Sequence, residues 1–256
     1  MIHLKCKSSE VAKFCLLPGD PCRAELIAKK YLSNYRVINK HRGLFAYTGK
    51  WKNIPVSVFT TGMGCPSAGI VVEEIAKLGV KYIIRVGTCG GVQKKINPGD
   101  YIIPDKAIPL IGLLKVYGIK YTPQFPDSDI FNILIKSVEN FVNRDTTQPR
   151  WVPVFSTKKE GQSLWTGTIC TSDAFYKEVE QARKWESKGV LAFEMECAGI
   201  FALAKLRRIK AGTILTATGN ILYGRQVMET PAIKKAIDRM ILIALEAIKE
   251  LKQKNG

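Results

Sequence analysis

A short apolar run that ends in an arginine and a glycine-rich turn constrains this 256-residue chain more than any other feature. Residues 81–91 read KYIIRVGTCGG, and the β-branched residues at their centre predict a buried strand. The glycines that follow let the backbone approach a ligand more closely than side chains permit. The stretch therefore predicts a strand that delivers a loop suited to ligand contact.

Arg85 interrupts this apolar strand, and a buried guanidinium requires a partner. Beside the Thr88 hydroxyl and a loop with free N–H groups, an anion such as phosphate meets that requirement. A structural arginine that caps the strand turn accounts for the same residues. This stretch alone leaves both interpretations open.

Strands alternate with helical patterns along the rest of the chain. Apolar runs predict strands at residues 14–17, 45–47, 56–60, 101–103, 167–170, 190–193 and 211–218. Apolar positions at helical spacing predict helices near residues 21–32, 66–78, 129–142, 178–188, 197–206 and 231–251. We expect a hairpin turn at residues 48–50 and a long segment with little regular structure at residues 104–126. The alternation predicts a layered α/β fold with a mixed sheet.

Length and charge narrow the class of protein further. A chain of 256 residues that is 46% hydrophobic fits one large domain, residues 1–256, better than two small ones. The 39 basic and 22 acidic residues give a formal net charge of +17, but the lysines are scattered over almost every predicted helix. Because no arginine-rich arm or aromatic-interleaved basic stripe appears, we expect no nucleic-acid partner. A lysine-rich solvated surface also attracts anionic substrates.

The seven cysteines are an odd number and contain no C-x-x-C pair, so we expect reduced thiols and neither a disulfide framework nor a metal site. The chain opens with no signal peptide and contains no apolar run long enough to span a bilayer. We therefore expect a cytoplasmic protein with no membrane association.

Two further local patterns suggest polar sites. The turn at residues 18–23 joins a strand to a helix N-terminus and carries Gly19 and Arg23, which is a weak signal for an anion site. Glu194 and Glu196 lie where an apolar strand meets an apolar helix, and we expect them to point to opposite faces. One carboxylate would brace a neighbouring element while the other accepts hydrogen bonds from vicinal hydroxyls. Taken alone, the pair is more typical of a structural ion pair.

Seven blocks along the chain together resemble a known family. In order they read LPGDPCRA, HRG, TTGMGCPS, RVGTCGGVQ, INPGD, TSDAFY and FEMECAG. They are similar to the hexameric nucleoside phosphorylases, which include bacterial-type purine nucleoside phosphorylase, uridine phosphorylase and archaeal methylthioadenosine phosphorylase. The resemblance implies a three-layer α/β/α sandwich assembled as a trimer of dimers. It also implies reversible phosphorolysis of a nucleoside to a free base and ribose 1-phosphate, with inorganic phosphate as co-substrate and no cofactor.

The resemblance also assigns site residues. It implies a phosphate site formed by Gly19, Arg23, Arg85 and Thr88, with Arg42 contributed to the neighbouring subunit. It implies a ribose site formed by Met195 and Glu196, with His3 reaching across the dimer. Arg85 and Glu196 are the implied catalytic residues. Phe175 resembles the aromatic wall of the base pocket, which Cys89, Gly90 and Phe193 are expected to line.

The segment after the last predicted strand departs from the purine pattern. Purine members of the family carry an aspartate there that protonates the base, whereas this chain has Thr218, Gly219 and Asn220, which we include among the expected base contacts. Uridine phosphorylases lack that acid and hold uracil with a glutamine and an arginine two residues apart. Gln181 and Arg183 match that pair, although slightly farther from the aromatic wall, so the sequence favours uridine.

Other functions stay open from the sequence. The WESKG and EMECAG segments resemble archaeal purine-type members as well, and Gln181 and Arg183 are equally typical of solvent-facing helix residues. A nucleosidase that uses water has no need of Arg23, Arg42 and Arg85 together. A catalytically decayed nucleoside- or nucleic-acid-binding protein is a remoter alternative, suggested by the net charge and Gly219.

Overall fold

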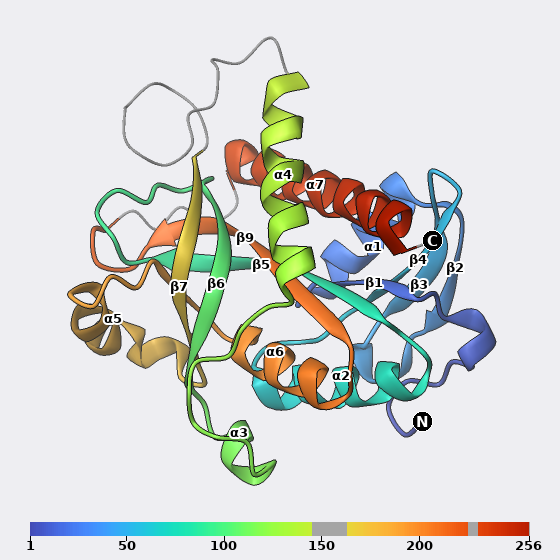
Figure 1. Ribbon diagram of the computed structural model, residues 1–256, viewed down its shortest axis with the longest axis horizontal. Helices are drawn as coiled ribbons and strands as arrows, with labels where there is room; N and C mark the ends of the chain where they lie inside the picture. Colours follow the sequence, from blue (N-terminus) through green and yellow to red (C-terminus); the bar gives the residue numbers. More distant parts are fainter. Residues whose placement is uncertain (145–162, 225–229, 256) are drawn as a thin grey trace.

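The computed structural model describes residues 1–144, 163–224 and 230–255 (Figure 1). Nine strands form one sheet: β1 (Phe14–Leu17), β2 (Ser33–Asn39), β3 (Ala46–Trp51), β4 (Ile54–Phe59), β5 (Tyr82–Gly91), β6 (Tyr101–Leu110), β7 (Leu164–Ser172), β8 (Ala192–Glu194) and β9 (Lys210–Asn220). The α-helices are α1 (Pro21–Tyr31), α2 (Cys65–Lys77), α3 (Leu113–Val116), α4 (Ser128–Arg144), α5 (Glu178–Glu186), α6 (Cys197–Leu206) and α7 (Pro231–Asn255). Short 3-10 turns are η1 (Ser8–Glu10), η2 (His41–Gly43) and η3 (Phe175–Lys177).

Helices cover both faces of the sheet, as the three-layer prediction requires. Helices α2 and α6 lie on one face, and α1, α4 and α7 lie on the other (Figure 1). The sheet is mixed, because β1 pairs in parallel with β4 and β5 while β3 pairs antiparallel with both β2 and β4. The expected α/β/α sandwich with a central mixed sheet is confirmed.

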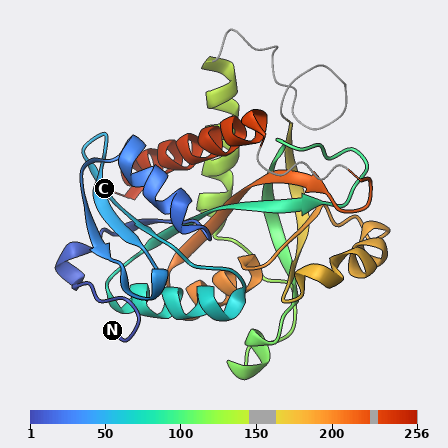
Figure 2. The ribbon, with the colours of Figure 1, turned by 180° about the vertical axis from the view of Figure 1, so that it is seen from behind.

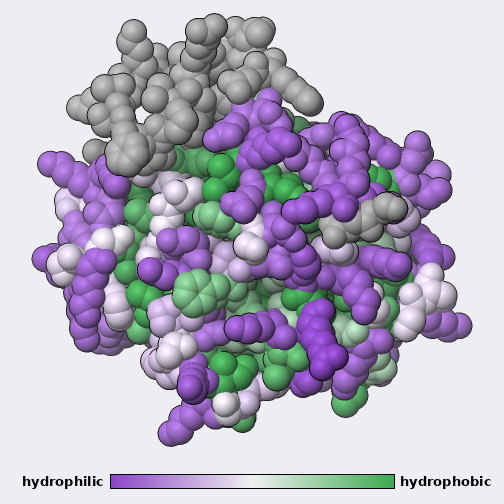
Figure 3. Space-filling model, viewed as in Figure 1, coloured by the Kyte–Doolittle hydropathy of each residue, from purple (hydrophilic) through white to green (hydrophobic). Residues whose placement is uncertain are grey.

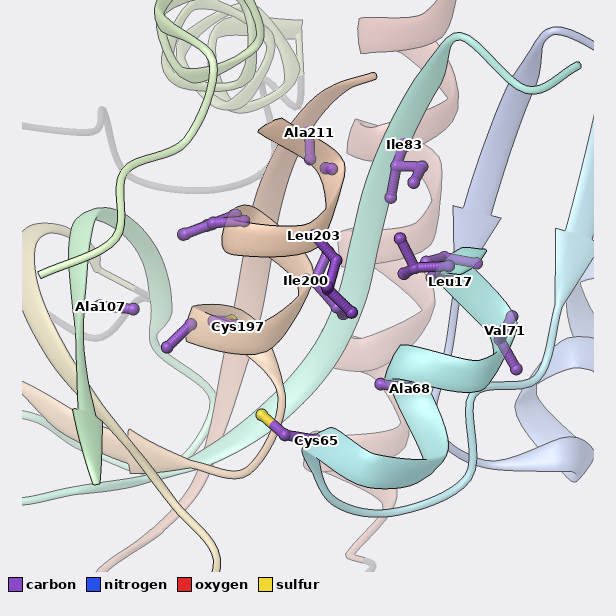
Figure 4. Packing of buried hydrophobic residues seen from close by; sticks show 14 of the residues in the cluster. Leu17, Cys65, Ala68, Val71, Ile83, Ala107, Cys197, Ile200, Leu203 and Ala211 are labelled. Carbon is purple, nitrogen blue, oxygen red and sulfur yellow. The ribbon is translucent and has the colours of Figure 1, made fainter. Parts of the chain in front are cut away.

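The alternation of side chains along the strands builds two hydrophobic cores. In β5, Ile83 joins the core under α2 and α6, whereas Ile84 and Val86 join the core under α1, α4 and α7. Figure 4 shows the first core, where Cys65, Ala68 and Val71 of α2 face residues of α6 and the strands. By the same period of two, Arg85 points to the face that carries α2 and α6. The strand pattern thus decides which helices surround the guanidinium.

Five of the strands close into a ring. Strand β5 pairs with β8, β8 with β7, β7 with β6, β6 with β9, and β9 pairs back with β5 (Figure 2). The register places Gly90 of β5 opposite both Phe193 of β8 and Gly219 of β9. Residues that are far apart in the sequence therefore meet at the carboxyl end of β5.

The sequence-based prediction of the first hairpin was wrong in two respects. Strand β2 was missed because five of its seven residues are exposed and its pattern is polar, as is typical of a sheet edge. The turn expected at residues 48–50 lies inside β3, and the chain reverses at Lys52 and Asn53, both at positive φ. Gly49 is needed within the strand because a Cβ there would lie 2.9–3.0 Å from atoms of Leu32, Ser33 and Tyr35.

The segment 104–126 is more regular than predicted. Strand β6 continues through Pro104 and Pro109 to Leu110, pairing with β7 along its length, and α3 follows. The register of that pairing shifts between Pro104 and Lys106, and such an irregularity accommodates a proline in a strand. Two prolines therefore misled the sequence-based assignment.

The surface matches the expected scatter of charge. Hydrophilic side chains cover most of the face seen in Figure 3, with small apolar areas between them. Several lysines pair with acidic residues, including Lys210 and Lys254, each 2.6 Å from an Asp129 carboxylate oxygen. In the described ranges, no helix is long and apolar enough to cross a membrane.

Close packing between β9 and α4 gives a stability prediction. A Cβ at Gly212 of β9 would overlap the Ile130 side chain of α4. We therefore expect Gly212→Ala to lower the free energy of unfolding by roughly 1–3 kcal/mol, measured by urea denaturation, because overpacking forces side chains from their preferred positions. The Ile130→Ala variant leaves a cavity instead, and the double variant should lose less stability than the sum of the two single changes. If the stability losses of the two single variants simply add up in the double variant, the proposed contact between Gly212 and Ile130 is contradicted.

Candidate active site

The Arg85 guanidinium is buried at the centre of a charged cluster. Its residue is 3% exposed, and its Nη2 atom lies 3.1 Å from Glu194 Oε2 and donates a hydrogen bond to Glu196 Oε2. Burial alone would lower the pKa of Arg85, but the charges of Glu196 and Glu194 raise it. The Nε and Nη1 atoms are buried and have no hydrogen-bond partner among the described residues. Two donors of a buried cation therefore remain for a ligand.

Gly87 leaves the space that the guanidinium occupies. A Cβ at this position would lie 2.8 Å from Arg85 Nη2 and 2.9 Å from Arg85 Cζ. A glycine two residues after the arginine is therefore required for the side chain to lie back along its own strand. The arginine and the glycine of the RVG motif are therefore linked sterically, because the Arg85 side chain occupies the space that a Cβ at Gly87 would need.

Glu194 and Glu196 converge on the same guanidinium, so the prediction that they point to opposite faces was wrong. Residues two apart in a strand share one face, so a continued strand would also have placed both carboxylates on the same side. In the structure, β8 ends at Glu194 and Glu196 is the N-cap of α6. Glu194 accepts hydrogen bonds from Glu196 N, Cys197 N and the Thr171 hydroxyl at 2.6–2.9 Å. Glu194 is thus a brace for the start of α6.

Glu196 is held from two sides. Its Oε1 atom accepts a hydrogen bond of 2.6 Å from the N–H of Gly64, the N-cap of α2, while its other oxygen faces Arg85. Burial raises the pKa of Glu196, and the charge of Arg85 opposes that rise. The carboxylate therefore lies where the N-termini of α2 and α6 meet the guanidinium. Met195, beside it in the chain, is partly exposed.

Arg23 lies close to Arg85. Asp20 caps the N-terminus of α1, and Arg23 in its first turn donates a hydrogen bond of 3.2 Å to the Val86 carbonyl of β5. Burial lowers the pKa of Arg23, and the charge of Arg85 lowers it further, while Asp20 opposes the shift. Gly19 packs near the Gly62 carbonyl oxygen, which would lie 3.2 Å from a Cβ. The unpartnered Nε and Nη1 donors of Arg85, together with the nearby Arg23 guanidinium, suit a phosphate.

The other two predicted phosphate residues lie differently. Thr88 is half-buried on β5, three residues after Arg85. Arg42 is exposed in η2 at a positive φ of 57°, and its side chain has no hydrogen-bond or ion-pair partner among the described residues. Its role toward a neighbouring subunit stays a prediction.

Glu74 of α2 anchors the N-terminus and His3. The backbone N–H groups of Ile2, His3 and Leu4 donate hydrogen bonds to this carboxylate, and the Leu4 bond is 2.7 Å long. His3 Nδ1 lies 3.0 Å from the same carboxylate. His3 is therefore fixed in place, although it does not contact Arg85 or Glu196 of its own chain. Its reach across a dimer stays a prediction.

Part of the predicted base site is assembled by strand register. Gly90 lies between Phe193 and Gly219, and Cys89 and Phe193 are both buried. Thr218 is the extra residue where the β5–β9 register shifts, and its hydroxyl donates a hydrogen bond of 3.4 Å to the Cys89 carbonyl. These residues share one end of β5, beyond Arg85.

Asn220 has another role in the structure. Its amide donates hydrogen bonds to the Gln93 and Ile96 carbonyls at 2.9 and 3.1 Å, and its oxygen accepts bonds from Leu222 N and Tyr223 N at 3.2 Å. The side chain is completely buried and hydrogen-bonded at every donor and acceptor group. The prediction that Asn220 contacts the base is therefore corrected, because the residue braces the turn after β9.

The glutamine and arginine expected to hold uracil are not gathered at this site. Gln181 and Arg183 are exposed on α5, while Ala182 between them is buried against Phe193. Phe175, in η3, is 59% exposed. The structure therefore brings Phe193 and Gly90 together but leaves Gln181, Arg183 and Phe175 on the surface of this chain.

Three functional positions were missed by sequence reasoning. Gly64 donates a hydrogen bond to Glu196, Glu74 anchors His3, and Glu178 is a buried carboxylate at the start of α5. Gly64 belongs to the TTGMGCPS block and was detectable, because a glycine before a helix offers its N–H group. Glu74 and Glu178 resemble ordinary helix carboxylates and gave no local signal. In the described parts of the chain, no group of His, Cys, Asp and Glu residues is arranged to hold a metal ion.

A sequence model of the phosphorylase superfamily matches residues 13–249. The chain belongs to the phosphorylase superfamily. The resemblance carried by the seven blocks is thereby confirmed, and the cluster around Arg85 is the candidate active site of a superfamily member.

Relatives and solved structures of the superfamily differ in the base that their names give. The chain is 34% identical over 254 residues to a DeoD-type purine nucleoside phosphorylase of an Exiguobacterium species, covering 98% of both chains. It is 36% identical over 249 residues to that of Caldanaerobacter subterraneus subsp. tengcongensis, covering 96% and 98%. A crystal structure of uridine phosphorylase from Vibrio fischeri ES114 matches with a TM-score of 0.83 and 23% identity, covering 97% and 96%. The last likeness supports the shared fold.

The Glu74 anchor of this phosphorylase superfamily member gives a pH prediction. Burial opposes ionisation, yet hydrogen bonds from His3, Leu4 and Ile2 lower the pKa of Glu74 to about 2 from an ordinary value of 4.5. The anchor therefore stabilises the fold fully above pH 4.5, and this contribution is lost as the pH falls toward 2. We expect Glu74→Gln to lower the melting temperature at neutral pH and to reduce its decrease over that acidic range.

The adjacent Glu73 supplies a matched control for this measurement. Glu73 pairs with Arg207 at 2.8 Å on the surface and does not contact the N-terminus. The Glu73→Gln variant should keep the melting temperature within a degree or two and the wild-type acid dependence, since exposed ion pairs contribute about 0–1 kcal/mol. Equal effects of the two substitutions would contradict the anchor.

Proposed function

We propose that the protein catalyses phosphate-dependent cleavage of a nucleoside to a free base and ribose 1-phosphate. The observation that carries the proposal is the buried Arg85 guanidinium with two unpartnered nitrogens, beside Arg23 and beside a carboxylate suited to ribose. A nucleosidase that uses water gains nothing from paired guanidinium groups. A decayed binding protein has no reason to keep Glu196 and Arg85 in contact at the cost of burying both.

Each residue has a separate task in this reaction. Arg85 and Arg23 hold phosphate so that one of its oxygens faces C1′ of the ribose, and their charge offsets that of the nucleophile. The new C1′–O bond forms as the C1′–N bond breaks, and the electron pair of that bond leaves with the base. Once phosphate is bound to Arg85, Glu196 accepts hydrogen bonds from the ribose hydroxyls.

We favour a purine as the departing base. Two facts support this choice: the relatives at 34–36% identity are named purine nucleoside phosphorylases, and Gln181 and Arg183 are exposed rather than gathered at Phe193. Uridine is the second candidate, because Gly219 offers no acid to a purine and the sequence segments favour uridine. The uridine phosphorylases similar in structure share only 22–23% identity, which bears on the fold alone.

We also propose a homo-oligomer, a hexamer built as a trimer of dimers, in which sites are shared within each dimer. His3 and Arg42 support it, because both are positioned by their own chain without contacting its Arg85 cluster. Large apolar side chains at Val116, Tyr121 and Phe125 are exposed and offer a surface for a second copy.

Base release with and without phosphate tests the reaction. We expect free base from inosine or adenosine only when phosphate is present, together with ribose 1-phosphate in equal amount. Arg85→Ala and Arg23→Ala should each lower kcat/KM for phosphate. The expected decrease corresponds to a loss of roughly 2–4 kcal/mol of transition-state stabilisation. Base released equally without phosphate would identify a nucleosidase, and a faster reaction with uridine would restore the second candidate.

Mixing two inactive variants tests the shared sites. Arg42→Ala and Glu196→Gln should each be inactive alone, yet co-refolded mixtures should regain activity, because one site of each mixed pair then receives both intact groups. The matched control mixes Arg85→Ala with Glu196→Gln, which belong to one site of one chain and should show no recovery. Absence of recovery in the first mixture would place Arg42 outside the neighbouring site.

A further inference from the structure

Glu178 is a buried carboxylate that the site described so far does not use. It is the first residue of α5 and is 7% exposed, whereas all eight other residues of the segment 173–181 are exposed. Its side chain makes no hydrogen bond or ion pair with any described residue. An isolated buried carboxylate costs free energy, so its retention calls for a purpose.

The surroundings of Glu178 place it at the base end of the site. Ala182, one helical turn later and on the same face of α5, packs with Phe193 and Cys170. The charge of Glu178 is close enough to raise the pKa of Cys89, a change to which burial and Glu194 contribute more. Glu178 therefore lies on the face of α5 that also carries Ala182, the face turned toward the cluster that contains Phe193.

The charged groups around Glu178 favour its neutral form. Glu194 on β8 and Cys89 on β5 are the titratable groups that face it, and on its own segment Lys177 pairs with Glu180 at the surface. Burial, together with the charge of Glu194, raises the pKa of Glu178 to about 7. The carboxyl group is thus part protonated at neutral pH and is able to donate a proton.

The end of β9 offers no acid that could protonate a departing purine. Gly219 follows Thr218 on β9 and carries no side chain, and Asn220 is fully engaged in its own turn. A purine departs readily only when the ring nitrogen N7 receives a proton as negative charge accumulates. Glu178, buried on the face of α5 that carries Ala182, offers a carboxyl group for that function.

We propose that Glu178 is the catalytic acid that protonates the departing purine. The inference rests on the proposed phosphorolysis. As the C1′–N9 bond breaks, its electron pair moves onto the base, and the Glu178 proton is transferred to N7, so that a neutral base leaves. Phosphate keeps its oxygen on C1′, and the proton that it releases to solvent balances the one that Glu178 takes up again. The carboxylate formed in between lies at the N-terminus of α5, whose dipole stabilises negative charge.

Two substrates separate a proton donor from a structural carboxylate. Inosine needs protonation at N7, whereas 7-methylinosine already carries a positive charge there and its base leaves without a proton. We expect Glu178→Gln to lower kcat for inosine by about 100-fold or more and to leave 7-methylinosine nearly unchanged. Glu180→Gln, on the exposed face of the same helix, should affect neither substrate.

The pH dependence gives a second readout. Phosphate itself titrates near neutral pH, so the ratio of inosine to 7-methylinosine rates is followed at each pH. In the wild type this ratio should fall above about pH 7, and it should be flat in Glu178→Gln. The Glu178→Asp variant keeps an acid and should keep the fall. Equal loss of both substrates, or an unchanged inosine rate, would overturn the proposal.

The two levels of failure are distinguishable. A wild type that releases base only with phosphate, combined with an unaffected Glu178→Gln variant, overturns the acid and leaves the phosphorylase. A wild type that releases base without phosphate overturns the phosphorolysis itself. If the wild type cleaves uridine but neither inosine nor adenosine, the proposals of a purine substrate and of Glu178 as the catalytic acid are both overturned. The proposed dependence on phosphate then still stands. Melting temperatures of all variants show whether each one is folded.

Discussion

The buried ion cluster of Arg85, Glu194 and Glu196 is the interaction on which the rest of the molecule depends. Breaking one member of such a cluster leaves an uncompensated buried charge, which costs several kcal/mol. The cluster joins strand β5 to the starts of α2 and α6, so the same contacts that orient the guanidinium also hold two helices on one face of the sheet. In the proposed reaction, stability and chemistry therefore share residues: Glu194 contributes to stability, and Glu196 contributes to both.

The ring of strands makes this cluster useful for binding. Because β9 returns to pair with β5, the positions beyond Arg85 are flanked by β8 on one side and β9 on the other. The cationic side chains Arg85 and Arg23 lie on one side of these positions, and the less polar residues Gly90 and Phe193 lie beyond them. In the proposed reaction the first group binds phosphate and the second contacts the base. The N-terminal segment and η2 lie outside the cluster in this chain, which is the physical basis for expecting a second copy to complete the site.

Local sequence predicted most elements and the core of the site, but it failed where packing overrides propensity. The strand and turn around Arg85 were predictable because β-branched residues, one arginine and Gly87 each have a local reason. The edge strand β2, the course of β6 and the positive-φ turn at Lys52 were not, because polar residues and prolines in strands depend on neighbouring strands. The opposite-face prediction for the two glutamates failed because residues two apart in a strand share one face, and both carboxylates reach Arg85.

The sequence by itself determined the layered α/β fold and the family, because alternating strand and helix patterns and seven ordered blocks run along the chain. The residues of the phosphate and ribose sites stay a prediction from the resemblance. Only the tertiary structure decided which residues of α5 face the sheet. The packing of α5 against the cluster that contains Phe193 buries Ala182 and Glu178 and leaves Gln181 and Arg183 in solvent, and no local pattern fixes that rotation. Whether a polar side chain of this helix is buried or hydrated is thus set by the contact between α5 and the sheet.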